Sequence, residues 1–158
     1  MGKHTVSINV NGAERSLSVD SPARLIDILR DDLGMKSVKE GCGTGDCGIC
    51  AVMLDGRLVN SCLTLAATCD GKRVVTLEGT LQDPAMRKIQ ESFMVHNGAQ
   101  CGFCTPAMLL ASWDLSKHST NPSEEEIKTA ISGVLCRCTG YYQIIEAIKE
   151  GCEKKGER

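Results

Sequence analysis

The first part of the chain alternates apolar and polar positions, and this period of two predicts β-strands. Val6, Ile8 and Val10 share one face of such a strand. The strand ends at Asn-Gly, the strongest short-range signal for a hairpin, so a partner strand is expected directly after it. By the same reasoning the sequence predicts strands at residues 3–10, 16–19, 51–54, 57–60 and 72–77, with the second hairpin turning at Asp-Gly.

One helix is expected to interrupt these strands. Ser21-Pro22 is a typical helix start, with proline at the first helical position, and Gly34 is a typical stop. The apolar positions between them recur with the helical period and are Leu25, Ile26, Ile28, Leu29 and Leu33. Residues 1–77 are therefore predicted to form a small α+β unit, with one helix across a mixed sheet.

After residue 80 no strand pattern remains, and the apolar positions follow the helical period. The predicted helix starts are Asp83-Pro84, Thr105-Pro106, Ser123 with Glu126 as a capping box, and Tyr141. Four short helices in this length favour a compact bundle. The sequence thus predicts two domains, residues 1–77 and 84–158, joined by a linker at residues 78–83.

Composition narrows the class of protein. A net charge of −2 over 158 residues gives no broad basic field for nucleic acid. The longest apolar run, residues 107–113, is too short to span a bilayer, and the first residues contain no apolar signal core. The ten cysteines fall in clusters, which suits metal binding in a thiol-reducing cytoplasm better than a secreted disulfide framework.

The first cysteine cluster lies in GCGTGDCGIC, residues 41–50. Cys42, Cys47 and Cys50 stand in the order C-x4-C-x2-C, the plant-type spacing for a [2Fe–2S] cluster. The glycines between them let the backbone wind closely around bridging sulfides, where a Cβ atom would not fit. Zinc is the alternative, but its ligands usually come as two close pairs, which this triple does not match.

The fourth ligand of this first site has two candidates. Cys62 follows the second hairpin, which begins at the cysteine loop, so the chain returns there naturally. Cys69 precedes an Asp-Gly turn and is expected to be a buried apolar residue. We therefore predict Cys62 as the ligand.

The second cysteine cluster is split between two loops. Cys101 and Cys104 precede the second helix of the bundle, and Cys136 and Cys138 precede the fourth. The positive end of each helix dipole then faces the thiolates. C-x2-C with C-x-C is unusual for zinc, and cysteines this close in sequence form strained disulfides. These four residues predict a second [2Fe–2S] cluster.

Seven bulky apolar residues of the helical part are expected to exceed what a small bundle can bury and so to form a partner interface. They are Met86, Phe93, Met94, Phe103, Met108, Leu109 and Trp113. No catalytic constellation accompanies them: the sequence has no Ser/His/Asp or Cys/His pattern, no Walker loop and no dinucleotide fingerprint. An electron carrier is therefore favoured over an enzyme acting on a substrate by itself.

Over residues 4–150 the chain resembles the small iron–sulfur subunit of the xanthine dehydrogenase, or molybdenum hydroxylase, family. The motifs that carry the resemblance are VKEGCGTGDCGICAVMLDG, VNSCL, AQCGFCTPAM and GVLCRCTGYYQII. It implies a β-grasp, plant-ferredoxin-like domain for the first cluster and an all-α four-helix bundle for the second. It also implies that Gln100 and the sulfur of Cys138 contact a molybdopterin cofactor.

The resemblance further implies a place in a larger complex, a dimer of heterotrimers. Electrons would pass from molybdopterin in a large subunit, through the bundle cluster and the ferredoxin-like cluster, to FAD in a medium subunit. The expected substrate of the complex is xanthine or another purine. The alternatives are an aldehyde, another N-heterocycle, carbon monoxide or 4-hydroxybenzoyl-CoA, and a free-standing two-cluster ferredoxin.

Overall fold

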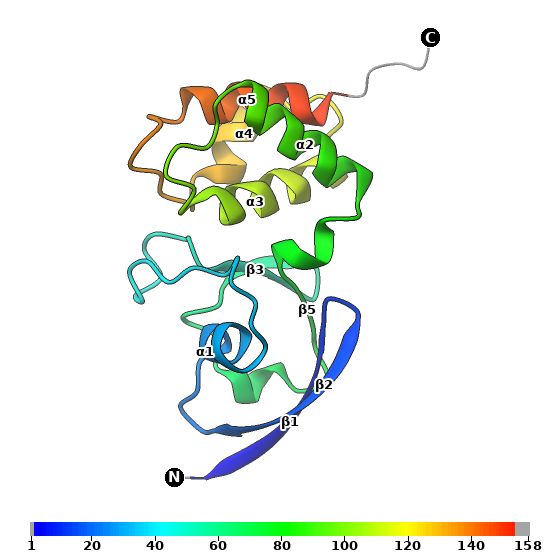
Figure 1. Ribbon diagram of the computed structural model, residues 1–158, viewed down its shortest axis with the longest axis vertical. Coiled ribbons are helices and arrows are strands. Elements are labelled where there is room, and N and C mark those ends of the chain that lie inside the picture. Colours follow the sequence, from blue (N-terminus) through cyan, green and yellow to red (C-terminus); the bar gives the residue numbers. More distant parts are fainter. Residues whose placement is uncertain (1, 154–158) are drawn as a thin grey trace.

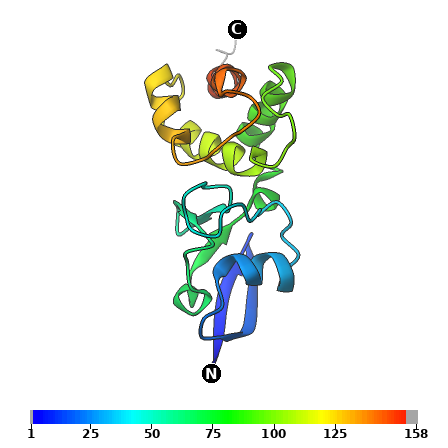
Figure 2. The same ribbon diagram turned by 90° about the vertical axis from the view of Figure 1, so that its left-hand side faces the viewer.

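The computed structural model describes residues 2–153 and combines a five-stranded sheet with five α-helices. The sheet lies in one half of the molecule and the longer helices in the other (Figures 1 and 2). Its strand order is β2-β1-β5-β3-β4, in which only the central pair β1–β5 is parallel. The strands are β1 (Lys3–Val10), β2 (Ala13–Asp20), β3 (Ala51–Leu54), β4 (Arg57–Asn60) and β5 (Arg73–Val75).

The helices divide in the same way. One turn of α-helix, α1 (Leu25–Asp27), continues directly into a π-helical turn, η1 (Ile28–Asp32), and packs on the sheet. Two 3-10 turns follow: η2 (Ala66–Cys69) lies between β4 and β5, and η3 (Leu77–Thr80) lies between β5 and α2. The remaining helices are α2 (Pro84–Val95), α3 (Thr105–His118), α4 (Glu124–Ile131) and α5 (Tyr142–Cys152).

Most of the expected elements are confirmed. Both hairpins form at their Asn-Gly and Asp-Gly turns. All four later helices begin within a residue of their expected starts. Asp83 accepts a hydrogen bond from the N–H of Ala85 at 2.8 Å, and Ser123 with Glu126 closes the capping box. Among residues 2–153, no helix is long and apolar enough to cross a membrane.

Two strand bounds and one helix start were wrong. The second strand begins earlier than expected, at Ala13, and the fifth ends at Val75. The first helix begins at Leu25 rather than at Pro22, because Arg24 keeps an extended backbone (φ −85°, ψ 153°) and pairs with Leu65 as an isolated β-bridge. This long-range pairing overrides the local signal of the proline.

Two apolar cores stabilise the molecule. One lies between the sheet and the first helix, with Ile8, Leu25 and Leu29 fully buried. The other lies among the later helices and also takes in Ala51 and Met53 of β3, so the sheet and α3 share a core.

This shared core corrects the expectation of a large apolar interface. Five of the seven bulky residues are at most 9% exposed, since the face of β3 adds to the room available: Met86, Phe93, Met108, Leu109 and Trp113. Only Met94 and Phe103 of that set are exposed, at 78% and 44%.

Candidate metal centres

The first cysteine loop, residues 41–50, directs its backbone N–H groups at sulfur. The N–H groups of Thr44 and Cys47 each donate to the Sγ of Cys42 at 3.4 Å, and the N–H of Cys42 donates to the Sγ of Cys47 at 3.4 Å. A Cβ atom at Gly41 would lie 2.8 Å from the Sγ of Cys47. The loop is therefore wound closely around its sulfurs, as a cradle for an inorganic cluster requires.

The second hairpin brings a fourth thiol to this loop. Cys50 and Cys62 flank the paired strands β3 and β4, both are buried, and their thiols are close enough to interact. Burial, followed by this interaction, raises the pKa of the Cys62 thiol to about 11. Cys69 is fully buried in the core beneath the sheet, where its thiol lies 3.6 Å from the carbonyl oxygen of Leu65. The structure thus brings Cys62 to the loop and leaves Cys69 elsewhere.

Cys42 differs from the other three thiols of the first group because it is exposed. Hydrogen bonds from the Thr44 side chain, and then from the N–H groups of Thr44 and Cys47, lower the pKa of Cys42 to about 6. Its sulfur is therefore stabilised as a thiolate before any positive metal charge is added.

The second cysteine group lies where the loops before α3 and α5 meet. The sulfurs of Cys101 and Cys138 are 3.5 Å apart and exposed. Cys104, the N-cap residue of α3, is buried and lies close enough to the thiol of Cys136 to interact with it. Burial, followed by that contact, raises the pKa of Cys104 to about 12. This group thus has one open pair of sulfurs and one enclosed pair.

The eight cysteines form two groups of four, and within each group the closest contacts join them two by two. The pairs are Cys42 with Cys47, Cys50 with Cys62, Cys101 with Cys138, and Cys104 with Cys136. Within residues 2–153, no three His, Cys, Asp or Glu side chains converge on one ion. A diiron cluster takes two thiolates on each iron, so each group of four thiols fits the donor set of one [2Fe–2S] cluster.

A cavity of about 620 Å³ lies between the two cysteine groups. It is lined by sulfurs of both: Cys42 and Cys47 from the first, and Cys101, Cys104, Cys136 and Cys138 from the second. The three cysteine-bearing loops, which precede β3, α3 and α5, lie on one side of the molecule (Figure 1). The two groups are therefore neighbours in space.

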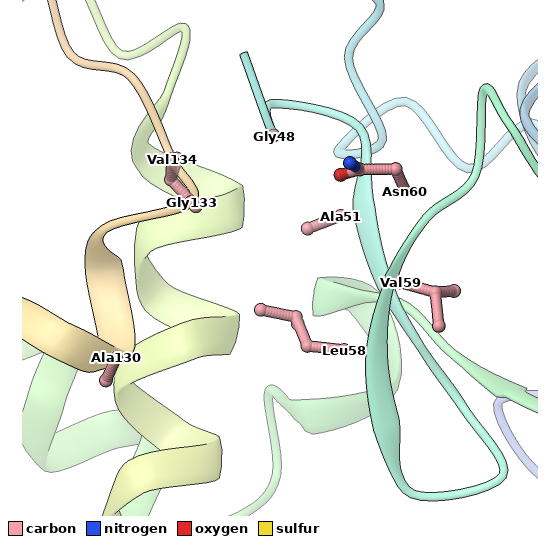
Figure 3. A pocket seen from close by; sticks show the side chains of 8 residues that line it. All are labelled: Gly48, Ala51, Leu58, Val59, Asn60, Ala130, Gly133 and Val134. Carbon is pink, nitrogen blue, oxygen red and sulfur yellow. The ribbon is translucent and has the colours of Figure 1, made fainter. Parts of the chain in front are cut away.

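The two halves touch through backbone at this point. The N–H of Leu135 donates to the carbonyl oxygen of Cys47 at 2.8 Å. Gly48 packs against Gly133 so closely that a Cβ atom on Gly48 would lie 1.8 Å from the Gly133 carbonyl oxygen. Figure 3 shows both glycines at one end of a smaller cavity of about 190 Å³, whose walls are the β3–β4 hairpin and the end of α4.

Gln100 and Cys138, the residues expected near a molybdopterin cofactor, are both exposed. They lie on the same open side of the second group, because Cys138 contacts Cys101, the residue after Gln100. Their role toward a pterin stays a prediction.

Sequence reasoning missed the residues that hold the second group in place. The Thr139 hydroxyl lies 3.1 Å from the Sγ of Cys136, and the Tyr141 hydroxyl accepts a hydrogen bond from the Cys136 N–H at 3.0 Å. The only signal in the sequence that could have pointed to them is their position in the run TGY, directly after Cys136 and Cys138. Threonine and tyrosine are common in turns, so the sequence alone does not show that their hydroxyls contact Cys136.

Comparison with known proteins agrees with these sites. The family model of a [2Fe-2S] binding domain matches residues 76–149. The chain is 42% identical over 154 residues to the nicotinate dehydrogenase small FeS subunit of Eubacterium barkeri, covering 98% of each chain. It is 38% identical over 152 residues to the xanthine dehydrogenase iron-sulfur-binding subunit of Escherichia coli O157:H7, covering 95% of this chain and 94% of that one.

A solved structure matches equally well. The chain superposes on a chain of quinoline 2-oxidoreductase from Pseudomonas putida 86 with a TM-score of 0.87 and 40% identity, covering 95% of this chain and 93% of that one. Fold and cysteine arrangement together define an electron-transfer protein of the [2Fe–2S] class. The chain belongs to the small iron–sulfur subunits of the xanthine dehydrogenase, or molybdenum hydroxylase, family of oxidoreductases.

Proposed function

We propose that this chain carries electrons between two partner subunits of a molybdenum hydroxylase and performs no chemistry on the substrate itself. Residues 1–77 form a β-grasp, ferredoxin-like domain, residues 78–83 a linker, and residues 84–158 a four-helix domain; residues 1 and 154–158 of these ranges lie outside the described residues. The strand order β2-β1-β5-β3-β4 with one helix across it supports the first assignment. The four helices α2 to α5 around one core support the second.

Each domain holds one [2Fe–2S] cluster. Cys42, Cys47, Cys50 and Cys62 ligate the first, and Cys101, Cys104, Cys136 and Cys138 ligate the second. When bound, the clusters supply reversible one-electron oxidation and reduction. The chain supplies the thiolates, the N–H groups directed at sulfur and the partial burial, which together set the reduction potential of each cluster.

The uneven exposure of the sulfurs suggests where each partner binds. The open pair of Cys101 and Cys138, with Gln100 beside it, faces a large molybdopterin-binding subunit. At the other site Cys42 is the exposed sulfur, and Leu63 and Leu65 are 62% and 46% exposed just after Cys62. An apolar patch beside an exposed ligand suits a medium FAD-binding subunit. Electrons enter at the second cluster and leave from the first, in a dimer of heterotrimers.

We place the substrate among aromatic N-heterocycles, with xanthine or another purine as one member of that class. The relatives described above are named for nicotinate, xanthine and quinoline, all of which contain a ring nitrogen. Selection among them resides in the large subunit, where the substrate would be oxidised. The ten free thiols are in keeping with a thiol-reducing compartment such as the cytoplasm.

The observation that carries the proposal is the gathering of eight cysteines into two neighbouring groups of four, with six of the eight lining one shared cavity. The test is anaerobic purification of the native complex, with metal analysis, electron paramagnetic resonance and a substrate panel of nicotinate, xanthine, quinoline and an aldehyde. We expect four irons per chain, two distinguishable reduced-cluster signals and molybdenum and flavin in the same particle. A single 17.0 kDa species would instead establish a free ferredoxin, and zinc without iron would refute the cluster assignment.

A further inference from the structure

Tyr141 has an unusual backbone conformation. Its φ of 70° and ψ of −21° lie in the left-handed region, immediately before α5. The other described non-glycine residues with positive φ are Asn11, Asp55 and Asn97, types that tolerate this region well. A bulky aromatic residue there is an outlier, and such strain persists only where the surrounding structure imposes it.

The conformation places the Tyr141 hydroxyl between two backbone groups of the second cysteine loop. The hydroxyl accepts the N–H of Cys136 at 3.0 Å and donates to the carbonyl oxygen of Val134 at 3.4 Å. The backbone N–H of Tyr141 donates to the Thr139 hydroxyl, which in turn lies 3.1 Å from the Cys136 sulfur. The tyrosine therefore holds Cys136 from two directions.

The residue between the two backbone partners of this hydroxyl is Leu135. Its N–H makes the 2.8 Å hydrogen bond to the carbonyl oxygen of Cys47, in the loop of the other cysteine group. Leu135 is 53% exposed, so its side chain does not hold the segment in place by burial. The Tyr141 hydroxyl fixes the backbone on both sides of this link.

Resting on the proposed function, we propose that Tyr141 is a positioning residue for electron transfer between the two clusters. Its hydroxyl holds residues 134–136 against the first cysteine loop and so maintains the direct hydrogen bond between the backbones of the two ligand sets. The hydroxyl also accepts the hydrogen bond of the Cys136 N–H, so this N–H does not donate to a sulfur of the second cluster. The strain at Tyr141 is the cost of placing this one hydroxyl.

A purely structural role would rest on the ring, which packs half-buried against the helical core. Tyr141→Phe separates the two roles, because it keeps the ring and removes only the hydroxyl. Tyr142→Phe is the matched control, since Tyr142 is the next residue, is 71% exposed and has no hydroxyl hydrogen bond within residues 2–153. Both variants are made in the complete complex with its clusters.

We expect three changes in Tyr141→Phe and none in Tyr142→Phe. Hydrogen exchange at the Leu135 amide becomes about fivefold faster, the factor for losing one ordinary hydrogen bond. Electron transfer from the second cluster to the first, followed after a pulse of reductant, becomes slower. The reduction potential of the second cluster rises while that of the first is unchanged, because the freed Cys136 N–H and entering water donate to sulfur and favour the reduced state.

The outcomes are distinguishable from failure of the proposed function. Fewer than four irons in the wild-type chain overturns the function itself. Loss of only the second cluster from Tyr141→Phe supports a positioning role. Should that variant not assemble, Tyr141→Asn removes the ring and the hydroxyl together at a residue type that tolerates left-handed φ, and wild-type Leu135 exchange and transfer rate in it would overturn the inference. The inference is overturned if Tyr141→Phe assembles with four irons and keeps three wild-type values: the Leu135 amide exchange rate, the rate of electron transfer between the clusters and both reduction potentials.

Discussion

The backbone N–H of Leu135 donates a hydrogen bond of 2.8 Å to the carbonyl oxygen of Cys47. One of these residues precedes a cysteine of the second group, and the other is a cysteine of the first. Cys47 and Leu135 are nearly 90 residues apart in the sequence. A path of a few covalent bonds and this one hydrogen bond therefore connects the two sets of cysteines. The hydrogen bond also needs the two loops to approach closely, which the neighbouring glycines permit.

The first prediction concerns that close approach. Gly48 has a φ of 64°, and a Cβ atom there would overlap the Gly133 carbonyl oxygen at 1.8 Å. We expect Gly48→Ala to lower the free energy of unfolding by about 2 kcal/mol or more, since overpacking against backbone cannot be relieved by a side-chain rotation. Urea unfolding of the purified chain measures this loss of stability, and its iron content shows whether the clusters are retained.

Gly133→Ala is the control for this substitution. A Cβ atom on Gly133 has no neighbour within 4 Å, so this variant should retain its iron and nearly all of its stability. Equal losses in the two variants would show that the glycine contact does not join the halves.

The second prediction tests the choice of the fourth ligand. The Cys62 thiol lies beside Cys50, whereas Cys69 is fully buried beneath the sheet. We expect Cys62→Ala to lose the first cluster, and with it half of the iron and one of two paramagnetic signals. Cys69→Ala should keep all its iron and lose about 1 kcal/mol of stability through the small cavity left behind. Full iron in Cys62→Ala with loss in Cys69→Ala would reverse the assignment.

Local signals in the sequence were sufficient for most of the fold. The turns Asn11-Gly12 and Asp55-Gly56 define both hairpins, because their geometry requires positive φ at those positions. The capping box at Ser123 likewise defines the start of α4. The cysteine spacing was enough to divide eight of the ten cysteines into two sites.

Contacts between distant residues could not be predicted in this way. The start of α1 depends on the bridge between Arg24 and Leu65, which no local pattern indicates. The packing of α3 on β3, which places Ala51 and Met53 in the helical core, is such a contact. The left-handed Tyr141 contradicts the preference of its residue type, and only the surrounding loops explain it.

The third prediction concerns pH. Glu78 in η3 accepts hydrogen bonds from the N–H and hydroxyl of Ser37, which leads into the first cysteine loop, and from the hydroxyl of Thr76. Burial alone would raise the pKa of Glu78, but these hydrogen bonds outweigh it and the pKa is lowered. A lowered carboxyl pKa contributes stability that is present above the unfolded pKa, about 4.3, and is lost as the pH falls through the folded value.

Glu78→Gln should therefore cost about 1.5 kcal/mol at pH 7, the lower end of the range of about 1.5 to 3 kcal/mol for hydrogen bonds to a charged group. The difference in unfolding free energy between wild type and variant should shrink as the pH falls below about 4.3. Anaerobic urea unfolding of both proteins at matched pH values measures it. Glu91→Gln, at an exposed position of α2, should show no such dependence, and a constant difference for Glu78→Gln would argue against the carboxylate as its cause.

The fourth prediction concerns the anchor of the first cysteine loop. The Arg24 guanidinium makes contacts of 2.6 Å both to Asp27, at the start of the first helix, and to Glu40, next to the loop. Its hydrogen bonds to Asp27, which has the larger effect, and to Glu40 raise the pKa of Arg24. The same hydrogen bond from Arg24 lowers the pKa of Asp27. Since these side chains are about one-third exposed, the link contributes only about 1 kcal/mol and weakens as salt is added.

Arg24→Gln should free the start of the loop, so that a chelator removes the first cluster up to about fivefold faster, the factor that corresponds to about 1 kcal/mol. The second cluster, held by loops that Arg24 does not contact, should be lost at the wild-type rate. Arg15→Gln on the exposed edge strand β2 is the control and should change neither rate. The difference between Arg24→Gln and wild type should narrow at high salt, because salt already screens the wild-type ion pairs. Equal acceleration at both clusters would mean that Arg24 stabilises the whole chain rather than this loop.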